Sequence, residues 1–224
     1  MKVLIIIPAY NEERNIKRVI EDLNRFYSSK DLLVVNDGSF DGTSEIAKQC
    51  GCRVIDLPCN LGVGGAVQTG IKFAKENGYD AAIQFDGDGQ HRAEYIDKLI
   101  EALSYADLSI GSRFLGGNSF DSSLFRGIGI KFFSLLVSIL TGKRFTDTTS
   151  GFRAFGKRAI DLFYDYYPVD YPEVESILYA NSNKLKIAEI PVLMNQRIEG
   201  RSSITPVKSV YYALKVTLAL LLKP

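Results

Sequence analysis

The chain has 224 residues, of which 46% are hydrophobic, and this supplies enough apolar surface for one compact domain. Its 27 basic and 26 acidic residues leave a net charge of +1, which argues against a nucleic-acid partner attracted by a global field. Three cysteines, one histidine and no CxxC pair argue against a zinc site, and the N-terminus lacks a secretory signal, so we expect a protein of the reducing cytosol.

The first half of the chain alternates short apolar runs with longer helical patterns. The apolar runs predict strands at 3–8, 32–36, 53–56, 81–85 and 107–111, and the segments between them predict helices at 12–27, 42–49, 64–77 and 93–103. Continuous apolar strands separated by helices are typical of a parallel sheet covered on both faces. We therefore expect a doubly wound α/β fold, in which ligands bind beyond the carboxyl ends of the strands.

The second half loses this alternation. We expect helices at 125–140, 173–181 and 206–222, and a strand at 186–193. No repeat or low-complexity linker divides the chain, so we expect one domain over 1–203 and an apolar helix within 204–224 that belongs to it or contacts a membrane surface. This last helix is too short to span a bilayer, which takes about 20 apolar residues.

Two carboxylates follow the fourth predicted strand, in the segment 86–90, Asp-Gly-Asp-Gly-Gln. If the backbone stays extended, Asp86, Asp88 and Gln90 point to one side, because side chains alternate along a strand. Such an oxygen-rich face suits Mg²⁺ or Mn²⁺, which keep open positions for phosphate oxygens. Asp-Gly is also a strong turn signal, so these residues alone support a plain turn and a metal site equally well.

Two other loops are expected near the same edge of the sheet. Asp37 follows the strand at 32–36, where it could accept hydrogen bonds from a ribose or a base, although its own Asp-Gly pattern favours a turn. The glycines of 60–66 precede a helix, as in phosphate-binding loops. The segment matches neither GxGxxG nor GxxxxGK[ST], so the dinucleotide-binding and P-loop interpretations are weak.

Taken in order, these motifs resemble those of the family-2 glycosyltransferases of the GT-A fold, and within them the dolichyl-phosphate mannose synthase-like group. The resemblance covers most of the chain and is carried by the segments 6–13, 37–43, 62–70, 86–91, 111–113 (Gly-Ser-Arg) and 150–153 (Ser-Gly-Phe-Arg). It implies a GT-A type fold with a mostly parallel sheet and a metal-dependent glycosyltransferase activity.

The resemblance also implies roles for particular residues. The nucleotide site would consist of Pro8, Tyr10, Glu12 and Asp37. The Mg²⁺ or Mn²⁺ that bridges the diphosphate would be held by Asp86, Asp88 and Gln90. Arg113 and Arg126 would meet the acceptor phosphate and Arg153 would lie near the donor or acceptor phosphates, which makes these arginines and Asp88 the expected catalytic residues. An arginine without its motif is more often a solvated surface residue or part of a helix-end ion pair.

The expected reaction is inverting transfer of a sugar from GDP-mannose or a UDP-hexose to a polyprenyl or dolichyl phosphate. The cation neutralises the charge that builds on the departing diphosphate. A phosphate acceptor is largely ionised at neutral pH and needs little help from a base. Transfer to a sugar hydroxyl in polysaccharide or glycoconjugate assembly remains an alternative and would need a base such as Asp147, Glu173 or Glu175.

A third alternative is a non-catalytic nucleotide-binding module recruited to a membrane, and the paired aspartates of 86–88 argue against it. We expect the protein at the cytoplasmic face of the membrane, bound peripherally to the surface or to a membrane protein. The helix at 206–222 and the apolar residues of 132–137 could lie on that surface, or they could complete the core or a dimer interface.

Overall fold

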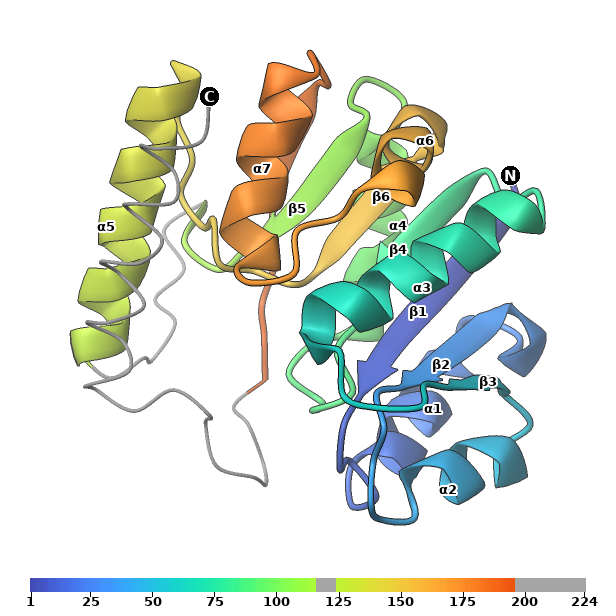
Figure 1. Cartoon of the computed structure of the whole chain (residues 1–224). Helices are drawn as coiled ribbons and strands as arrows, with labels where there is room; N and C mark the ends of the chain where they lie inside the picture. The colour runs from blue at the N-terminus through green and yellow to red at the C-terminus, as the bar shows by residue number, and fades with distance from the viewer. Residues whose placement is uncertain (116–123, 196–224) are drawn as a thin grey trace.

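The computed structural model describes residues 1–115 and 124–195, and the helix expected at 206–222 lies outside these ranges. Seven strands form one sheet in the order β3-β2-β1-β4-β6-β5-β7 (Figure 1). Their bounds are β1 Val3–Ala9, β2 Leu32–Asn36, β3 Arg53–Asp56, β4 Ala81–Gln84, β5 Leu108–Ser112, β6 Arg153–Gly156 and β7 Ile187–Pro191. Every neighbouring pair is parallel except those that involve β6. The expected mostly parallel α/β fold is confirmed.

Helices cover both faces of this sheet (Figure 1). One layer contains α1 (Ile16–Leu23), α2 (Thr43–Gln49) and α4 (Ile96–Ala102). The other layer contains α3 (Gly62–Glu76), α6 (Lys157–Asp165) and α7 (Pro172–Ser182), and α5 (Leu124–Thr141) packs against α7 at its outer side. Short 3₁₀ turns occupy Ser29–Asp31 and Ala93–Tyr95. Within 1–115 and 124–195, no helix combines the length and hydropathy of a membrane span.

The central strand β1 shows why both layers are needed. Leu4 and Ile6 belong to the core on the α3 side, while Ile5 and Ile7 belong to the core on the α1 side, and all four are 0% exposed. Side chains alternate along a strand, so a continuous apolar run buries both faces of the sheet. The α3 layer approaches closely, because a Cβ on Gly70 would lie 2.3 Å from Cγ2 of Ile6.

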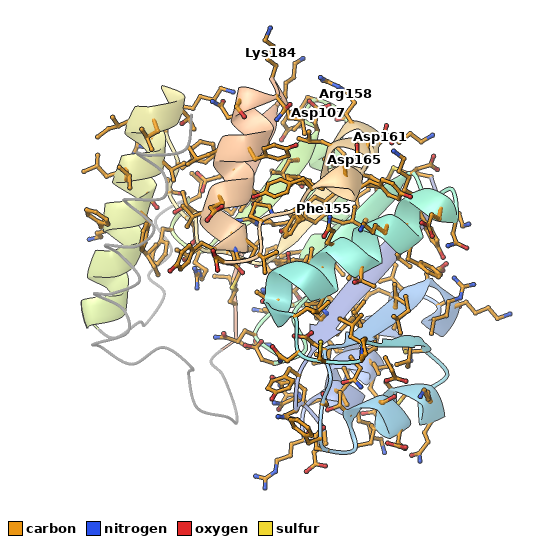
Figure 2. All side chains as sticks on the ribbon, in the orientation of Figure 1. Asp107, Phe155, Arg158, Asp161, Asp165 and Lys184 are labelled. Atoms are coloured by element: carbon orange, nitrogen blue, oxygen red, sulfur yellow. The ribbon has the colours of Figure 1, made fainter. Side chains whose placement is uncertain are left out.

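At the amino end of β5 an ion pair and a backbone hydrogen bond hold the neighbouring elements together. Asp107, beside the start of β5, accepts hydrogen bonds from Nη1 of Arg158 at 3.0 Å and from the backbone N–H of Lys186 at 2.7 Å (Figure 2). Phe155, from β6, lies deeper in the core, with its ring centroid 5.7 Å from that of Phe163. These contacts cover the start of β5 with neighbouring side chains.

The sequence pattern does not predict β6 or α6. Strand β6 is four residues long, begins with Arg153, and runs antiparallel between β4 and β5, which come from the first half of the chain. Its pairing depends on strands distant in the sequence, so a local apolar pattern carries little sign of it. The first helix is also shorter than expected, because residues 13–15 form a turn before Ile16.

Candidate nucleotide and metal site

A cavity of about 280 Å³ opens at the carboxyl ends of β1, β2 and β4. This is the edge at which doubly wound sheets bind their ligands. Six of the residues singled out in the sequence line it: Pro8, Tyr10, Glu12, Asp37, Asp86 and Asp88. The structure therefore brings together residues from three segments that are far apart in the chain.

The loops after β1 and β2 are tied to each other by hydrogen bonds. The backbone N–H of Asn11 donates to Oγ of Ser39 at 2.9 Å, and its side-chain Oδ1 accepts from the N–H of Phe40 at 2.9 Å. The N–H of Glu12 donates to Oγ1 of Thr43 at 2.8 Å. Asn11 has a φ of 55°, a left-handed conformation that asparagine tolerates better than most residues. These bonds fix one wall of the cavity.

Asp37 stabilises the start of α3. It is 3% exposed, and its two carboxylate oxygens accept hydrogen bonds from the N–H groups of Leu61 at 2.7 Å and Gly62 at 2.9 Å. Burial raises the pKa of Asp37 above its usual value, while these two bonds act in the opposite direction. Gly38 is needed beside it, because its φ is 69° and a Cβ would lie 2.8 Å from the carbonyl carbon of Cys59. The amides of 61–62 thus already bind an anion, the carboxylate of Asp37.

The segment after β4 does not stay extended. The backbone turns at 87–88, and Gly89 has a φ of 76°, so the assumption of one extended face is wrong. Asp86 and Asp88 still line the same cavity. In the described part of the chain, Gln90 is not among the residues that line this cavity. Its backbone N–H donates to Oδ1 of Asp88 at 3.0 Å. A cation contact by the Gln90 side chain therefore remains a prediction.

The loop before β6 borders the carboxylate of Asp86. Strand β6 pairs antiparallel with β4, with Gln84 opposite Arg153, and this register continues beyond the strands to place Gly151 beside Asp86. A Cβ on Gly151 would lie 2.8 Å from Oδ2 of Asp86. On the other carboxylate oxygen, Nε2 of Gln84 donates to Oδ1 at 3.2 Å. Two motifs that are far apart in the sequence therefore meet at one carboxylate.

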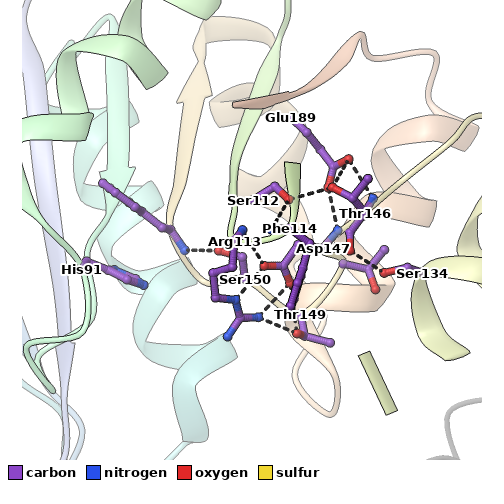
Figure 3. Close-up of polar contacts among 12 residues, drawn as sticks. His91, Ser112, Arg113, Phe114, Ser134, Thr146, Asp147, Thr149, Ser150 and Glu189 are labelled. Carbon is purple, nitrogen blue, oxygen red and sulfur yellow. Dashed lines mark hydrogen bonds and ion pairs between the residues drawn. The ribbon is translucent and has the colours of Figure 1, made fainter. Parts of the chain in front are cut away.

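Arg113 lies just beyond β5 in a buried polar network (Figure 3). Its Nε and Nη2 donate to the two carboxylate oxygens of Asp147 at 2.6 and 2.7 Å, and Nη2 also donates to Oγ1 of Thr149 at 2.8 Å. Glu189 in turn accepts the N–H groups of Asp147 and Thr146 at 2.7 and 2.8 Å. Burial raises the pKa of Glu189 and these backbone bonds oppose the rise. Arg113 is thus held in place by a bidentate ion pair.

Arg153 is 0% exposed, and its guanidinium is surrounded by protein acceptors. Nε donates to the carbonyl of Ser150 at 2.8 Å, Nη1 to Oγ of Ser176 at 2.6 Å, and Nη2 to the carbonyl of Glu173 at 2.7 Å. Burial raises the pKa of the Glu173 carboxyl, and the charge of Arg153 lowers it. The side chain joins the loop before β6 to the first turn of α7, and its expected place near the donor or acceptor phosphates stays a prediction.

Arg126 is the remaining expected catalytic residue. It falls in the first turn of α5, and its side chain lies outside the part of the chain that the structure describes. Its contact with an acceptor phosphate therefore stays a prediction.

His91, Gly151 and Glu189 support the site, although the sequence motifs assigned them no role. His91 accepts a hydrogen bond from the backbone N–H of Asp86, and Gly151 leaves room for the Asp86 carboxylate. A sole histidine beside paired aspartates was a usable signal for the first. The sequence signal for Glu189 was weaker: it is a charged residue within a predicted apolar strand.

A divalent cation is compatible with this geometry only together with other ligands. In residues 1–115 and 124–195, no three His, Cys, Asp or Glu side chains are grouped so that they could hold a metal ion by themselves. Asp86 and Asp88 do supply carboxylate oxygens at one cavity. Mg²⁺ is commonly bound by one or two carboxylates, with phosphate oxygens and water completing the shell. The donor set fits a cation that binds with a diphosphate.

Comparison with known sequences identifies relatives of this chain. The family model described as glycosyl transferase family 2 matches residues 4–163. The UDP-N-acetylglucosamine–dolichyl-phosphate N-acetylglucosaminyltransferase of Methanococcus voltae is 34% identical over 212 residues, which cover 85% of this chain and 84% of that protein. The undecaprenyl-phosphate mannosyltransferase of Micrococcus luteus is 37% identical over 171 residues, covering 72% and 70%.

The fold has solved counterparts as well. Glucosyl-3-phosphoglycerate synthase from Mycobacterium tuberculosis, solved with Mn²⁺, UDP and phosphoglyceric acid, superposes with a TM-score of 0.75 at 17% identity, covering 100% of this chain and 79% of that one. At this identity the likeness concerns the fold. The family model spans most of the sequence, and the relatives above exceed 30% identity over more than two thirds of it. The chain therefore belongs to glycosyl transferase family 2 and is a glycosyltransferase of the dolichyl-phosphate mannose synthase-like group.

Proposed function

We propose that this enzyme transfers a sugar from a nucleoside-diphosphate sugar to a polyprenyl phosphate, with inversion at the anomeric carbon. The observation that carries the proposal is the cavity at the carboxyl edge of the sheet, where the expected nucleotide residues and both aspartates of 86–88 meet. The relatives from M. voltae and M. luteus are named for transfer to dolichyl and undecaprenyl phosphate, which supports the same class of acceptor.

The nucleotide would bind against the loops after β1 and β2. Tyr10 is 42% exposed at the cavity, so its ring is available for stacking on a base. The carboxylate of Glu12 can accept hydrogen bonds from ribose hydroxyls. Asp37 already accepts two amides, but each carboxylate oxygen has a second lone pair for a ligand. Pro8 completes the wall of the cavity.

Asp86 and Asp88 would hold Mg²⁺ or Mn²⁺ against the diphosphate. A bound divalent cation stabilises the negative charge that develops on a departing diphosphate. Both carboxylates face the same cavity. Gln84 and Gly151 restrict the orientation of the Asp86 carboxylate, and the backbone N–H of Gln90 restricts that of Asp88. Preorganised ligands of this kind need no rearrangement during the reaction.

The acceptor would approach from the side of β5. Strand β5 is antiparallel to β6, which is antiparallel to β4, so β5 ends at the same edge of the sheet as the cavity. Arg113 follows it there and is proposed to attract the acceptor phosphate, and Arg126 is proposed to do the same from α5. Asp147 is fully buried and paired with Arg113, which makes it a poor base for a sugar hydroxyl and so favours an ionised phosphate acceptor.

We also infer that the enzyme works peripherally at the cytoplasmic face of a membrane. One side of α5 exposes large apolar residues: Phe132 at 44%, Leu135 at 62%, Ile139 at 69% and Leu140 at 41%. Exposed apolar stripes on a helix are a common means of binding a lipid surface. The domain over 1–203 and the helix within 204–224 remain part of this proposal, with the helix as a second contact.

The reaction is tested by incubating the enzyme with Mn²⁺, a panel of UDP- and GDP-sugars and short polyprenyl phosphates, and identifying the products by mass and anomeric configuration. The proposal predicts a sugar attached to the prenyl phosphate with inverted configuration, and loss of product in Asp88→Asn, which keeps the side-chain shape but removes its charge. Product on an added oligosaccharide alone would favour a sugar-hydroxyl acceptor. A retained configuration would contradict direct displacement.

A further inference from the structure

His91 is held rigidly at the end of the loop that follows β4. It is the one histidine of the chain and is 4% exposed. Its ring stacks on that of Phe152, with centroids 4.6 Å apart and planes 14° apart, and it meets the ring of Phe85 edge to face at 5.4 Å and 84°. Packing on both rings leaves the imidazole one orientation.

In that orientation both ring nitrogens of His91 lie close to Asp86. Its Nδ1 accepts a hydrogen bond from the backbone N–H of Asp86 at 3.0 Å. A ring nitrogen that accepts carries no proton, so the neutral ring has its proton on Nε2. Nε2 lies 3.5 Å from Oδ2 of Asp86, where its N–H is electrostatically attracted to the carboxylate. One imidazole thus contacts both the peptide group and the side chain of Asp86.

The other neighbours of Asp86 also restrict the orientation of its carboxylate. Gln84 donates to Oδ1, and Gly151 lies so close to both oxygens that a Cβ there would be 2.8 Å from Oδ2 and 3.2 Å from Oδ1. The loop itself contains Gly87 and Gly89, which restrain the backbone little. The orientation of the carboxylate therefore depends on its neighbours, and His91 is the one that fixes the backbone as well.

We propose that His91 is a positioning residue for the cation site: it sets the orientation of the Asp86 carboxylate without touching cation or substrate. This inference rests on the proposed role of Asp86 as a cation ligand. Groups that orient a ligand of a metal are typically worth about 10- to 100-fold in metal affinity or activity. A histidine that served only the packing of the core would leave cation affinity unchanged when an aromatic ring of similar shape replaced it.

The test uses His91→Phe, which keeps the ring stack and removes both nitrogens, and His91→Asn, whose Oδ1 can occupy the place of Nδ1. The measurement is the affinity for Mn²⁺ in the presence of UDP or GDP, followed by electron paramagnetic resonance of the free ion. We expect His91→Phe to weaken Mn²⁺ binding by about tenfold. His91→Asn should lie between His91→Phe and wild type, because it restores the acceptor for the Asp86 N–H but not the contact from Nε2.

Two controls separate positioning from stability and from the proposed function. Phe163→Leu removes part of a buried ring on α6, in the other core layer, and should lower the unfolding temperature without changing Mn²⁺ affinity. Wild-type Mn²⁺ affinity in folded His91→Phe and His91→Asn overturns the role of His91. If Asp86→Asn loses affinity in the same experiment, the cation site stands without it; if Asp86→Asn also binds as wild type, the cation site fails too.

Discussion

The aspartates at the carboxyl edge of the sheet differ in what surrounds their charge. Asp37 accepts two backbone amides from the start of α3, and Asp147 is paired with the guanidinium of Arg113. Asp86 accepts a hydrogen bond from the Gln84 side chain on Oδ1, has Nε2 of His91 at 3.5 Å from Oδ2, and faces the cavity beside Asp88. The first two carboxylates have charged or backbone donors that hold the fold, whereas the pair at 86–88 is the one that we propose holds the cation.

Gly151→Ala tests the space that Asp86 requires. The new Cβ would lie 2.8 Å from both Oδ2 of Asp86 and Nε2 of Gln84, so the carboxylate must move. We expect the transferase rate to fall by about tenfold or more, as for other losses of ligand orientation. The matched control is Gly129→Ala on α5, where a Cβ would meet no atom within 4 Å, and it should retain activity. Wild-type activity in Gly151→Ala would contradict this account of Asp86.

Glu189 should make stability depend on pH. Burial raises the pKa of its carboxyl above the usual 4.5, so the folded state binds the proton more tightly than the unfolded state. Stability from this group is therefore full below the unfolded pKa and is lost as the pH rises through the folded one. Urea unfolding of wild type and Glu189→Gln between about pH 4 and 7 should show the difference shifting in favour of the variant as pH rises. A constant difference would contradict the raised pKa.

Among the elements, the parallel strands were predictable and the inserted antiparallel strand was not. The strand expected at 32–36 coincides with β2, because a buried parallel strand leaves a continuous apolar run in the sequence. The strand expected at 53–56 also coincides with β3, which is a partly exposed edge strand. Strand β6 has no such run, since it contains the buried Arg153 and is stabilised by pairing with distant strands. The position of the 150–153 motif beside Asp86 follows from that pairing and could not be predicted from the sequence either.

Arg153→Ala should loosen the junction between β6 and α7. It would remove the guanidinium donor from the buried carbonyl of Ser150 and from the buried Oγ of Ser176, and each unsatisfied group costs about 1–3 kcal/mol. We expect the free energy of unfolding, from urea denaturation, to fall by at least about 3 kcal/mol, with Arg153→Lys intermediate. An Arg153→Ala protein of wild-type stability that had lost activity would instead indicate a direct contact with phosphate.

At the scale of the whole molecule, one edge of the sheet gathers the reactive groups while α5 presents an apolar side. The cavity, Arg113 and the 150–153 loop all lie at the carboxyl ends of β1, β4 and β5, whereas Asp107 and its partners lie at the amino end of β5. The sequence predicted this edge, since loops after parallel strands share it. The exposed apolar side of α5 and the Arg113–Asp147 ion pair could be recognised only in the packed structure.

The apolar side of α5 is tested with phospholipid vesicles that contain polyprenyl phosphate. Replacing Leu135 and Ile139 together by glutamate puts two charges on the proposed contact and should abolish flotation with vesicles, because a charged group does not enter the apolar boundary. Tyr105→Glu is the matched control: it is 61% exposed, precedes β5 at the far edge of the sheet and should float as wild type. Equal flotation of both variants would exclude α5 as the membrane contact.

The central claim is that Asp86 and Asp88 hold a divalent cation against the diphosphate of the donor. Calorimetric titration of UDP and GDP, with and without Mn²⁺, into wild type and Asp88→Asn tests it most directly. We predict that Mn²⁺ strengthens binding of the preferred nucleotide to the wild type by about tenfold, or roughly 1.4 kcal/mol, and has little effect on the variant. Equal nucleotide affinity with and without Mn²⁺ in the wild type would contradict the account.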